Sequence, residues 1–105
     1  MKGTEKQIKW AEDIQRKVIE TIDLMFEMVR DDPRSQTEAA QKAQAKVARA
    51  RQAVAECESA HDLIEVYGSV KTSAPAKDNI GPVSAAIRNR FGIDRTPAQK
   101  KLIGE

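Results

Sequence analysis

The sequence predicts an all-α protein, a small helical bundle built on a long antiparallel helical hairpin with short C-terminal helices. Apolar residues recur at spacings of three and four along two long stretches, as on one face of a helix. Residues typical of helix N-termini precede both stretches, and no segment reads convincingly as a strand. At 105 residues the chain has the length of one domain. We expect helices at about 4–31, 35–58, 60–68 and 83–91.

The first helix is expected to begin at Thr4, because Gln7 three residues later completes a capping box. The Asp31-Asp32-Pro33 segment ends it, since proline disfavours helical geometry in the preceding residue. Its main apolar stripe consists of Ile8, Ala11, Ile14, Val18, Ile22, Met25 and Val29. Further apolar residues widen this stripe, which indicates packing on more than one side: Trp10, Leu24, Phe26 and Met28.

The second helix is expected to begin at a capping box formed by Ser35 and Glu38. Its apolar positions form a heptad seam of small residues: Ala40, Ala43, Val47, Ala50, Val54 and Cys57. The simplest partner for this seam is the first helix folded back on it, although a homodimer is an alternative. Acids of the first helix should then face bases of the second: Glu20, Asp23 and Glu27 against Lys42, Lys46 and Arg49.

The rest of the chain divides into shorter pieces, and the expected units are 1–70, a loop or linker at 71–82, and a basic helical segment at 83–105. The second helix continues through His61, or else Ser59 starts a short third helix that Gly68 ends. Two prolines and a glycine indicate the loop. Pro82 or Val83 begins the next helix, and Thr96-Pro97 offers a cap for a last turn.

Composition and charge restrict the function classes. The formal charge of +2 is too small for a nucleic-acid footprint by itself, although residues 71–105 carry 7 basic and 3 acidic side chains. A single cysteine excludes an internal disulfide. No stretch has the length of a membrane span, and the first residues lack an apolar signal core. We therefore expect a cytoplasmic protein without membrane contact.

Two groups of side chains could carry chemistry, and for both an ordinary structural role is the favoured interpretation. Cys57 and His61 are four residues apart and could form a thiolate–imidazole pair or half of a zinc site. Acidic pairs at Glu20 and Asp23, and at Asp62 and Glu65, could hold Mg²⁺, as in all-α nucleotide pyrophosphohydrolases. We expect no catalytic residue, no bound metal and no cofactor.

Basic and aromatic side chains are the better candidates for contact with a macromolecule. Arg88-Asn89-Arg90-Phe91, with Arg95, could grip phosphate or an acidic protein groove. Trp10 lies beside the main stripe of the first helix, where it either packs or anchors an interface. A basic ridge on the second helix could contact nucleic acid: Lys42, Lys46, Arg49 and Arg51.

Residues 3–14, Gly-Thr-Glu-Lys-Gln-Ile-Lys-Trp-Ala-Glu-Asp-Ile, resemble a segment of small phage and mobile-element proteins, roughly Gly-x-Glu-Lys-Gln-Ile-x-Trp-Ala-Glu-x-Ile. The resemblance carries no known chemistry. It implies a phage or mobile-element accessory protein, and many such proteins inhibit or adapt host machinery, including nucleic-acid-guided defence.

The function that we expect is non-enzymatic binding to a protein or ribonucleoprotein complex, as in an anti-CRISPR-type inhibitor that occupies a surface. Arg88, Arg90, Phe91, Arg95 and Trp10 are the expected contact residues. The first alternative is a small nucleic-acid-binding protein that uses its basic helix faces. The remote alternative is the Mg²⁺-dependent pyrophosphohydrolase.

Overall fold

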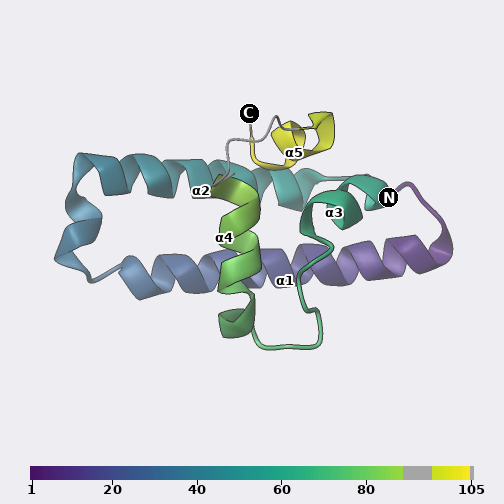
Figure 1. Ribbon diagram of the computed structural model, residues 1–105, viewed down its shortest axis with the longest axis horizontal. Helices are drawn as coiled ribbons and strands as arrows, with labels where there is room; N and C mark the ends of the chain where they lie inside the picture. The colour runs from purple at the N-terminus through teal and green to yellow at the C-terminus, as the bar shows by residue number, and fades with distance from the viewer. Residues whose placement is uncertain (89–95, 105) are drawn as a thin grey trace.

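The computed structural model describes residues 1–88 and 96–104, and it confirms the all-α helical bundle (Figure 1). Two long helices, α1 (Glu5–Val29) and α2 (Glu38–Glu56), are followed by three short ones. These are α3 (Ala60–Tyr67), α4 (Ile80–Arg88) and α5 (Pro97–Leu102). Short 3₁₀ turns, η1 (Pro33–Gln36) and η2 (Ala76–Asn79), precede α2 and α4. Among the described residues, the one β-type pairing is a single bridge between Lys2 and Ser59.

Helix α1 begins with the predicted capping box. The Thr4 hydroxyl accepts a hydrogen bond from the Gln7 N–H, and the Gln7 side chain accepts one from the Thr4 N–H. The predicted stripe is buried in the middle of the helix, where its side chains form the centre of the core: Ala11, Ile14, Val18 and Ile22. Thr21 is also buried, and its hydroxyl donates to the Lys17 carbonyl inside the same helix.

Helix α2 runs back along α1, so the two form an antiparallel hairpin (Figure 1). Hydrogen bonds between residues far apart in the sequence hold the two helices together. The side-chain amide of Gln15 donates to the Val54 carbonyl at 2.7 Å, close to the open end of the hairpin. Nearer the turn, the guanidinium of Arg51 donates to the carboxylate of Asp23 at 2.7 Å.

The turn of the hairpin differs from the prediction. Ser35 does not cap α2, because it lies inside η1 and its hydroxyl donates to the Asp32 carbonyl at 2.6 Å. Thr37 is the cap instead, and its hydroxyl accepts from the Ala40 N–H. Pro33 explains the displacement, since its fixed φ suits the first position of a short helix and inserts η1 before α2 can begin.

The heptad seam of α2 is buried over half its length only. Ala50, Val54 and Cys57 are buried, whereas Ala40 and Val47 are half-buried and Ala43 is exposed. The expectation of a continuous buried seam was therefore wrong for the first half of α2. This half lies next to the turn of the hairpin.

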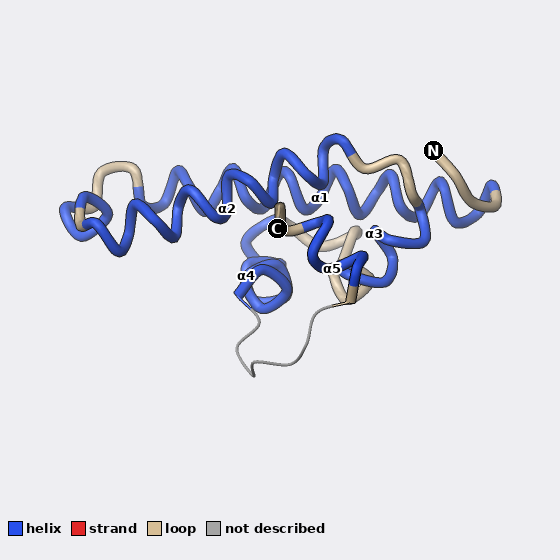
Figure 2. The backbone as a smooth tube through the Cα atoms, turned by 90° about the horizontal axis from the view of Figure 1, so that it is seen from above, coloured by secondary structure: helices blue, strands red, loops and turns tan. Residues whose placement is uncertain are grey.

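A second layer of helices covers one face of the hairpin (Figure 2). Helices α3, α4 and α5 all lie on this face, and α3 has the most extensive packing against α1. Ser59 starts α3, and its hydroxyl accepts from the Asp62 N–H, which settles the choice between a continued α2 and a new helix. As predicted, α3 ends before Gly68. The layer stops short of the hairpin turn, so that end of the hairpin projects beyond it.

The segment between α3 and α4 is held by one buried side chain. The Asn79 carbonyl oxygen accepts from the Lys71 N–H at 2.7 Å, and its NH₂ group donates to the carbonyls of Lys71 and Pro75. Helix α4 then begins at Ile80, two residues before the predicted Pro82. Val83 and Ile87, spaced by four, face the core.

Helix α5 folds back onto α2 and α3. Thr96 and Gln99 form a capping box, which confirms the predicted Thr96-Pro97 start. Leu102 and Ile103 are buried in the common core. Gly104 adopts φ +77°, and a Cβ atom there would lie 2.8 Å from Cβ of Arg49, so the chain end approaches α2 closely. None of the described helices is both long enough and apolar enough to span a membrane.

Candidate binding groove

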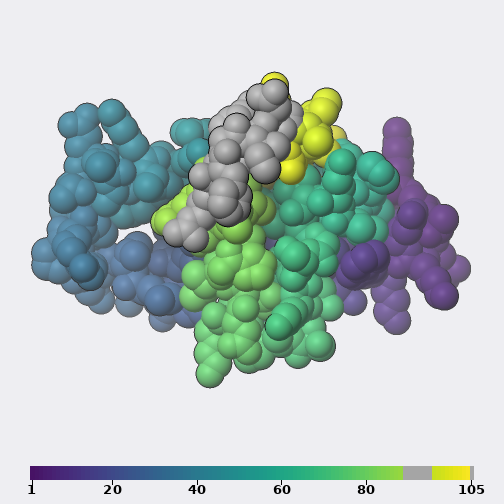
Figure 3. Space-filling view, viewed as in Figure 1, coloured from purple at the N-terminus to yellow at the C-terminus, as the bar shows by residue number. Residues whose placement is uncertain are grey.

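An apolar groove of about 480 Å³ lies at the projecting end of the hairpin, beside α4. Figure 3 shows the surface there, between the ends of α1 and α2 and next to α4. The apolar side chains that line it come from three helices: Met25, Phe26 and Val29 of α1, Ala40, Ala43 and Val47 of α2, and Ile87 of α4. We call this the turn groove.

The turn groove exists because two features of the sequence coincide there. The first half of α2 offers only small side chains at Ala40 and Ala43, and the opposing Met25 and Phe26 are large but remain half-buried. Farther along, where α3, α4 and α5 cover the hairpin, the same seam is fully buried. Ile87 is the last described α4 residue that is buried, so the core ends at the groove.

A second, more polar hollow of about 460 Å³ adjoins the turn groove. Both are lined by Phe26, Val29, Ser35 and Gln44, and the second adds charged side chains: Asp23, Glu27 and Arg30. The hairpin is therefore loosely packed at this end, and its apolar side chains are accessible. Met28, which lies between the groove residues Phe26 and Val29 in the sequence, is 63% exposed.

Charge at the rim of the turn groove is uneven. Asp32 and Arg34 neutralise each other through hydrogen bonds of 2.8–3.2 Å. These bonds lower the pKa of the Asp32 carboxyl, with a further hydrogen bond from the Arg34 N–H, and they raise the pKa of the Arg34 guanidinium. Lys46 and Arg88 also line the groove, and neither forms an ion pair with any residue of 1–88 or 96–104. Within the described residues, the rim thus carries two positive charges without an ion-pair partner.

The predicted pairing of acids on α1 with Lys42, Lys46 and Arg49 is wrong for the described residues, where the ion pair across the hairpin uses Arg51 instead. Arg51 holds Asp23 across the hairpin, and this hydrogen bond lowers the pKa of the Asp23 carboxyl. Glu20 instead pairs with Lys17 within α1, and Lys42 pairs with Glu38 within α2. Side chains at spacings of three and four on one helix are direct neighbours, so these pairs within a helix form readily.

The basic ridge predicted on α2 is consequently reduced. Lys42 and Arg51 are engaged with acids, Lys46 lines the turn groove, and Arg49 lies beneath Gly104. The four residues do not present one uninterrupted basic surface.

The residues predicted to contact a partner are not all in one place. Arg88 lines the turn groove, whereas Arg90, Phe91 and Arg95 lie outside the described residues. Trp10 is 46% exposed and does not pack into the core. It stands about 22 Å from Met25 along the axis of α1, at 1.5 Å per residue, so it belongs to a different surface.

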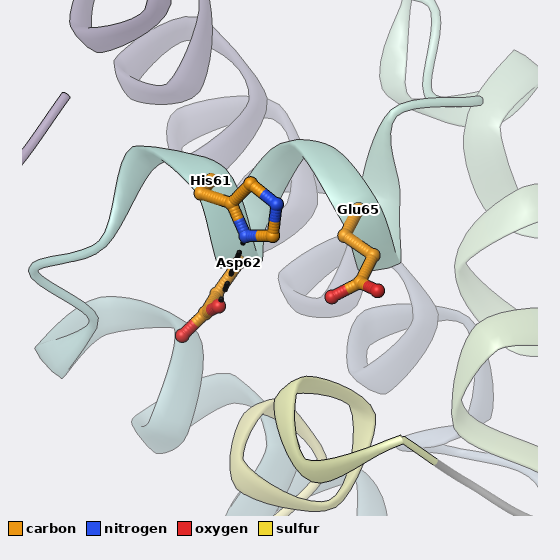
Figure 4. A group of neighbouring side chains, drawn as sticks. All are labelled: His61, Asp62 and Glu65. Atoms are coloured by element: carbon orange, nitrogen blue, oxygen red, sulfur yellow. Dashed lines mark ion pairs between the residues drawn. The ribbon is translucent and has the colours of Figure 1, made fainter.

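The structure does not bring Cys57 and His61 together as a pair on one helix. Cys57 is buried at the end of α2, and His61 is 78% exposed on α3. His61 instead neighbours Asp62 and Glu65, with ligand atoms within 4.8 Å of one another (Figure 4). Asp62 also faces Lys101 at 3.8 Å, which competes for its carboxylate. Among the described residues, Glu20 and Asp23 do not join this group, so the two acidic pairs do not form one metal site.

Sequence reasoning missed the turn groove, although a signal for it exists. The apolar stripe of α1 widens at 24–28, opposite the smallest residues of the seam, and this mismatch could have indicated a space between them. The chain matches no family profile, no curated protein and no solved structure.

Proposed function

We propose that this chain is a non-enzymatic binding protein that holds a protein or ribonucleoprotein partner against its turn groove. The observation that carries the proposal is one concave surface that combines accessible apolar side chains with two cations, Lys46 and Arg88, that have no ion-pair partner in the described parts of the chain. Grooves of this composition are typical of protein-recognition sites, and methionine and phenylalanine adapt well to a partner.

The class of partner follows from the resemblance of residues 3–14 to phage and mobile-element proteins. Such a protein would inhibit a host complex by occupying one of its surfaces, as an anti-CRISPR-type inhibitor does. Arg88 supports this proposal through its place at the groove. The proposal keeps four further residues as predicted contacts: Arg90, Phe91, Arg95 and Trp10.

The test compares two substitutions on α2 in an affinity capture from host lysate. Ala43→Glu puts a charged side chain into the turn groove, and because Ala43 is exposed, we expect the fold to survive. Ala45→Glu adds the same side chain to the same helix at an exposed position outside the groove. We expect the wild type and Ala45→Glu to retain one complex. Ala43→Glu should lose at least about nine-tenths of the captured complex, which corresponds to about 1.4 kcal/mol of binding free energy. Equal capture by all three would contradict the use of the groove.

Nuclease treatment of the same lysate distinguishes protein binding from the alternative, nucleic-acid binding. If the partner is nucleic acid bound through Lys42, Lys46, Arg49 and Arg51, capture collapses on digestion, and affinity falls steeply with salt. The two intramolecular ion pairs of Lys42 and Arg51 favour the protein-binding proposal, because they leave fewer free cations for phosphate.

A further inference from the structure

We infer that the turn groove receives an amphipathic α-helix of a partner protein, about two turns in contact, with acidic residues directed at Lys46 and Arg88. This inference rests on the proposed function and adds the chemistry of the occupant. Three features support it: the shape of the groove walls, the length of the groove and the charge at its rim.

The walls of the turn groove suit a helix. They are formed by α1 and α2, and the small side chains of Ala40 and Ala43 let another backbone approach closely. The protein already contains one such arrangement, since α4 lies across the hairpin with Val83 and Ile87 buried at a spacing of four. An incoming helix would lie beside α4 and extend the second layer over the uncovered end of the hairpin.

The length of the groove sets how much of the helix is held. On α2 the apolar wall runs from Ala40 to Val47, which is about 10 Å at 1.5 Å per residue. About two turns of the partner therefore make contact, and they would present apolar side chains at positions i, i+3 or i+4, and i+7.

The positive charge at the rim of the groove favours a partner with negative charge. Of the charged side chains that line the groove, Asp32 and Arg34 are engaged with each other. Lys46 and Arg88 form no ion pair within the described residues, so carboxylates of a partner would add most to the affinity when they lie next to these two cations. A basic helix would place like charges together in the same position.

The experiment uses two stapled helical peptides of about 18 residues, long enough to hold a helix when stapled. Both carry leucine at i, i+3 and i+7, and they differ only in having glutamate or lysine at the flanking positions. Binding is followed by NMR of ¹³C-methyl methionine in the full chain. Met25 lines the groove, and Met1 is a control, because it packs against the core and is not among the groove residues. We expect saturable shifts of Met25, and affinity about tenfold higher for the glutamate peptide, the scale of two exposed ion pairs.

Charge-altered variants of the chain complete the test. Lys46→Glu with Arg88→Glu should reverse the preference between the peptides, and the neutral pair Lys46→Gln with Arg88→Gln should abolish it. Lys9→Glu with Lys77→Glu makes the same change of net charge at exposed positions outside the groove and should leave the preference intact. Circular dichroism checks that each variant is folded.

Three outcomes would overturn the inference. Equal affinity for both peptides would contradict the claim that the partner helix is acidic. No response of Met25 to either peptide would contradict the claim that a helix binds in the groove. Concentration-dependent dimerisation of the chain alone, blocked by Ala43→Glu, would make a second copy the occupant. The proposed function has separate criteria, since it fails if Ala43→Glu captures its partner as well as Ala45→Glu does, or if capture collapses on nuclease digestion.

Discussion

Asn79 shows how one buried polar residue can organise a segment without regular structure. Its amide makes three hydrogen bonds to the main chain of Lys71 and Pro75. The two carbonyls also accept from the N–H groups of Ala74 and Asp78, whereas the Lys71 N–H donates to Asn79. The residue is fully buried, so water cannot replace these bonds. The segment between α3 and α4 is thereby closed on itself, and α4 starts in a defined place on the hairpin.

Replacing Asn79 by alanine should therefore cost about 2 kcal/mol of unfolding free energy, because it removes three hydrogen bonds and leaves the Lys71 N–H without its acceptor. For a chain of this size the melting temperature should fall by about 10 °C, measured by circular dichroism. Asp78→Ala, at the exposed neighbouring position, should change stability by less than about 0.5 kcal/mol. Equal effects of the two substitutions would show that the amide does not hold the segment.

At the scale of elements, the ends of the helices depend on individual side chains. Thr4, Thr37, Ser59 and Thr96 each accept a hydrogen bond from a main-chain N–H in the first turn of a helix. These N–H groups have no partner within the helix itself. The cap at Thr37 matters most for the turn groove, because α2 supplies one groove wall from its first turn onward.

Removing the hydroxyl at this cap, in Thr37→Ala, should destabilise the protein by about 1 kcal/mol in denaturant unfolding. Thr37→Ser keeps the accepting oxygen and should restore most of the loss. If Thr37→Ser were as unstable as Thr37→Ala, the methyl group rather than the hydrogen bond would be responsible.

The whole molecule has two layers of unequal length. The hairpin is long, and the second layer of α3, α4 and α5 covers only the part away from the turn (Figure 2). Buried residues are concentrated under this cover, while the apolar residues near the turn stay half-buried or exposed. An accessible apolar surface next to a well-packed core is the expected form of a binding surface in so small a domain.

Amide hydrogen exchange should reveal this division. Main-chain amides of residues 26–29 and 40–47 should exchange at least about tenfold faster than those of residues 11–22 and 50–54, because helices without tertiary cover open more readily. A bound helical peptide should slow exchange in the first group and not in the second. Uniform protection along both helices would contradict the two-part description of the hairpin.

Sequence periodicity and capping signals were sufficient for helix starts that are set by residues within a few positions. It predicted α1 with its capping box, the start of α3 at Ser59 as one of two alternatives, and the cap of α5 at Thr96. It was wrong about Ser35 as the cap of α2, since Pro33 favours a 3₁₀ turn first. It also placed the start of α4 at Pro82 or Val83, two or three residues late, because Pro82 is accommodated inside the first turn of a helix that Asn79 positions.

Taken by itself, the sequence determined the helical class, the two long helices and most helix ends, because these depend on local spacing and on caps a few residues away. Only the tertiary structure decided which half of the α2 seam is buried, which charges are paired and where an apolar groove remains. Those features depend on how far α3, α4 and α5 extend over the hairpin, and no periodicity within one helix records where another helix stops covering it.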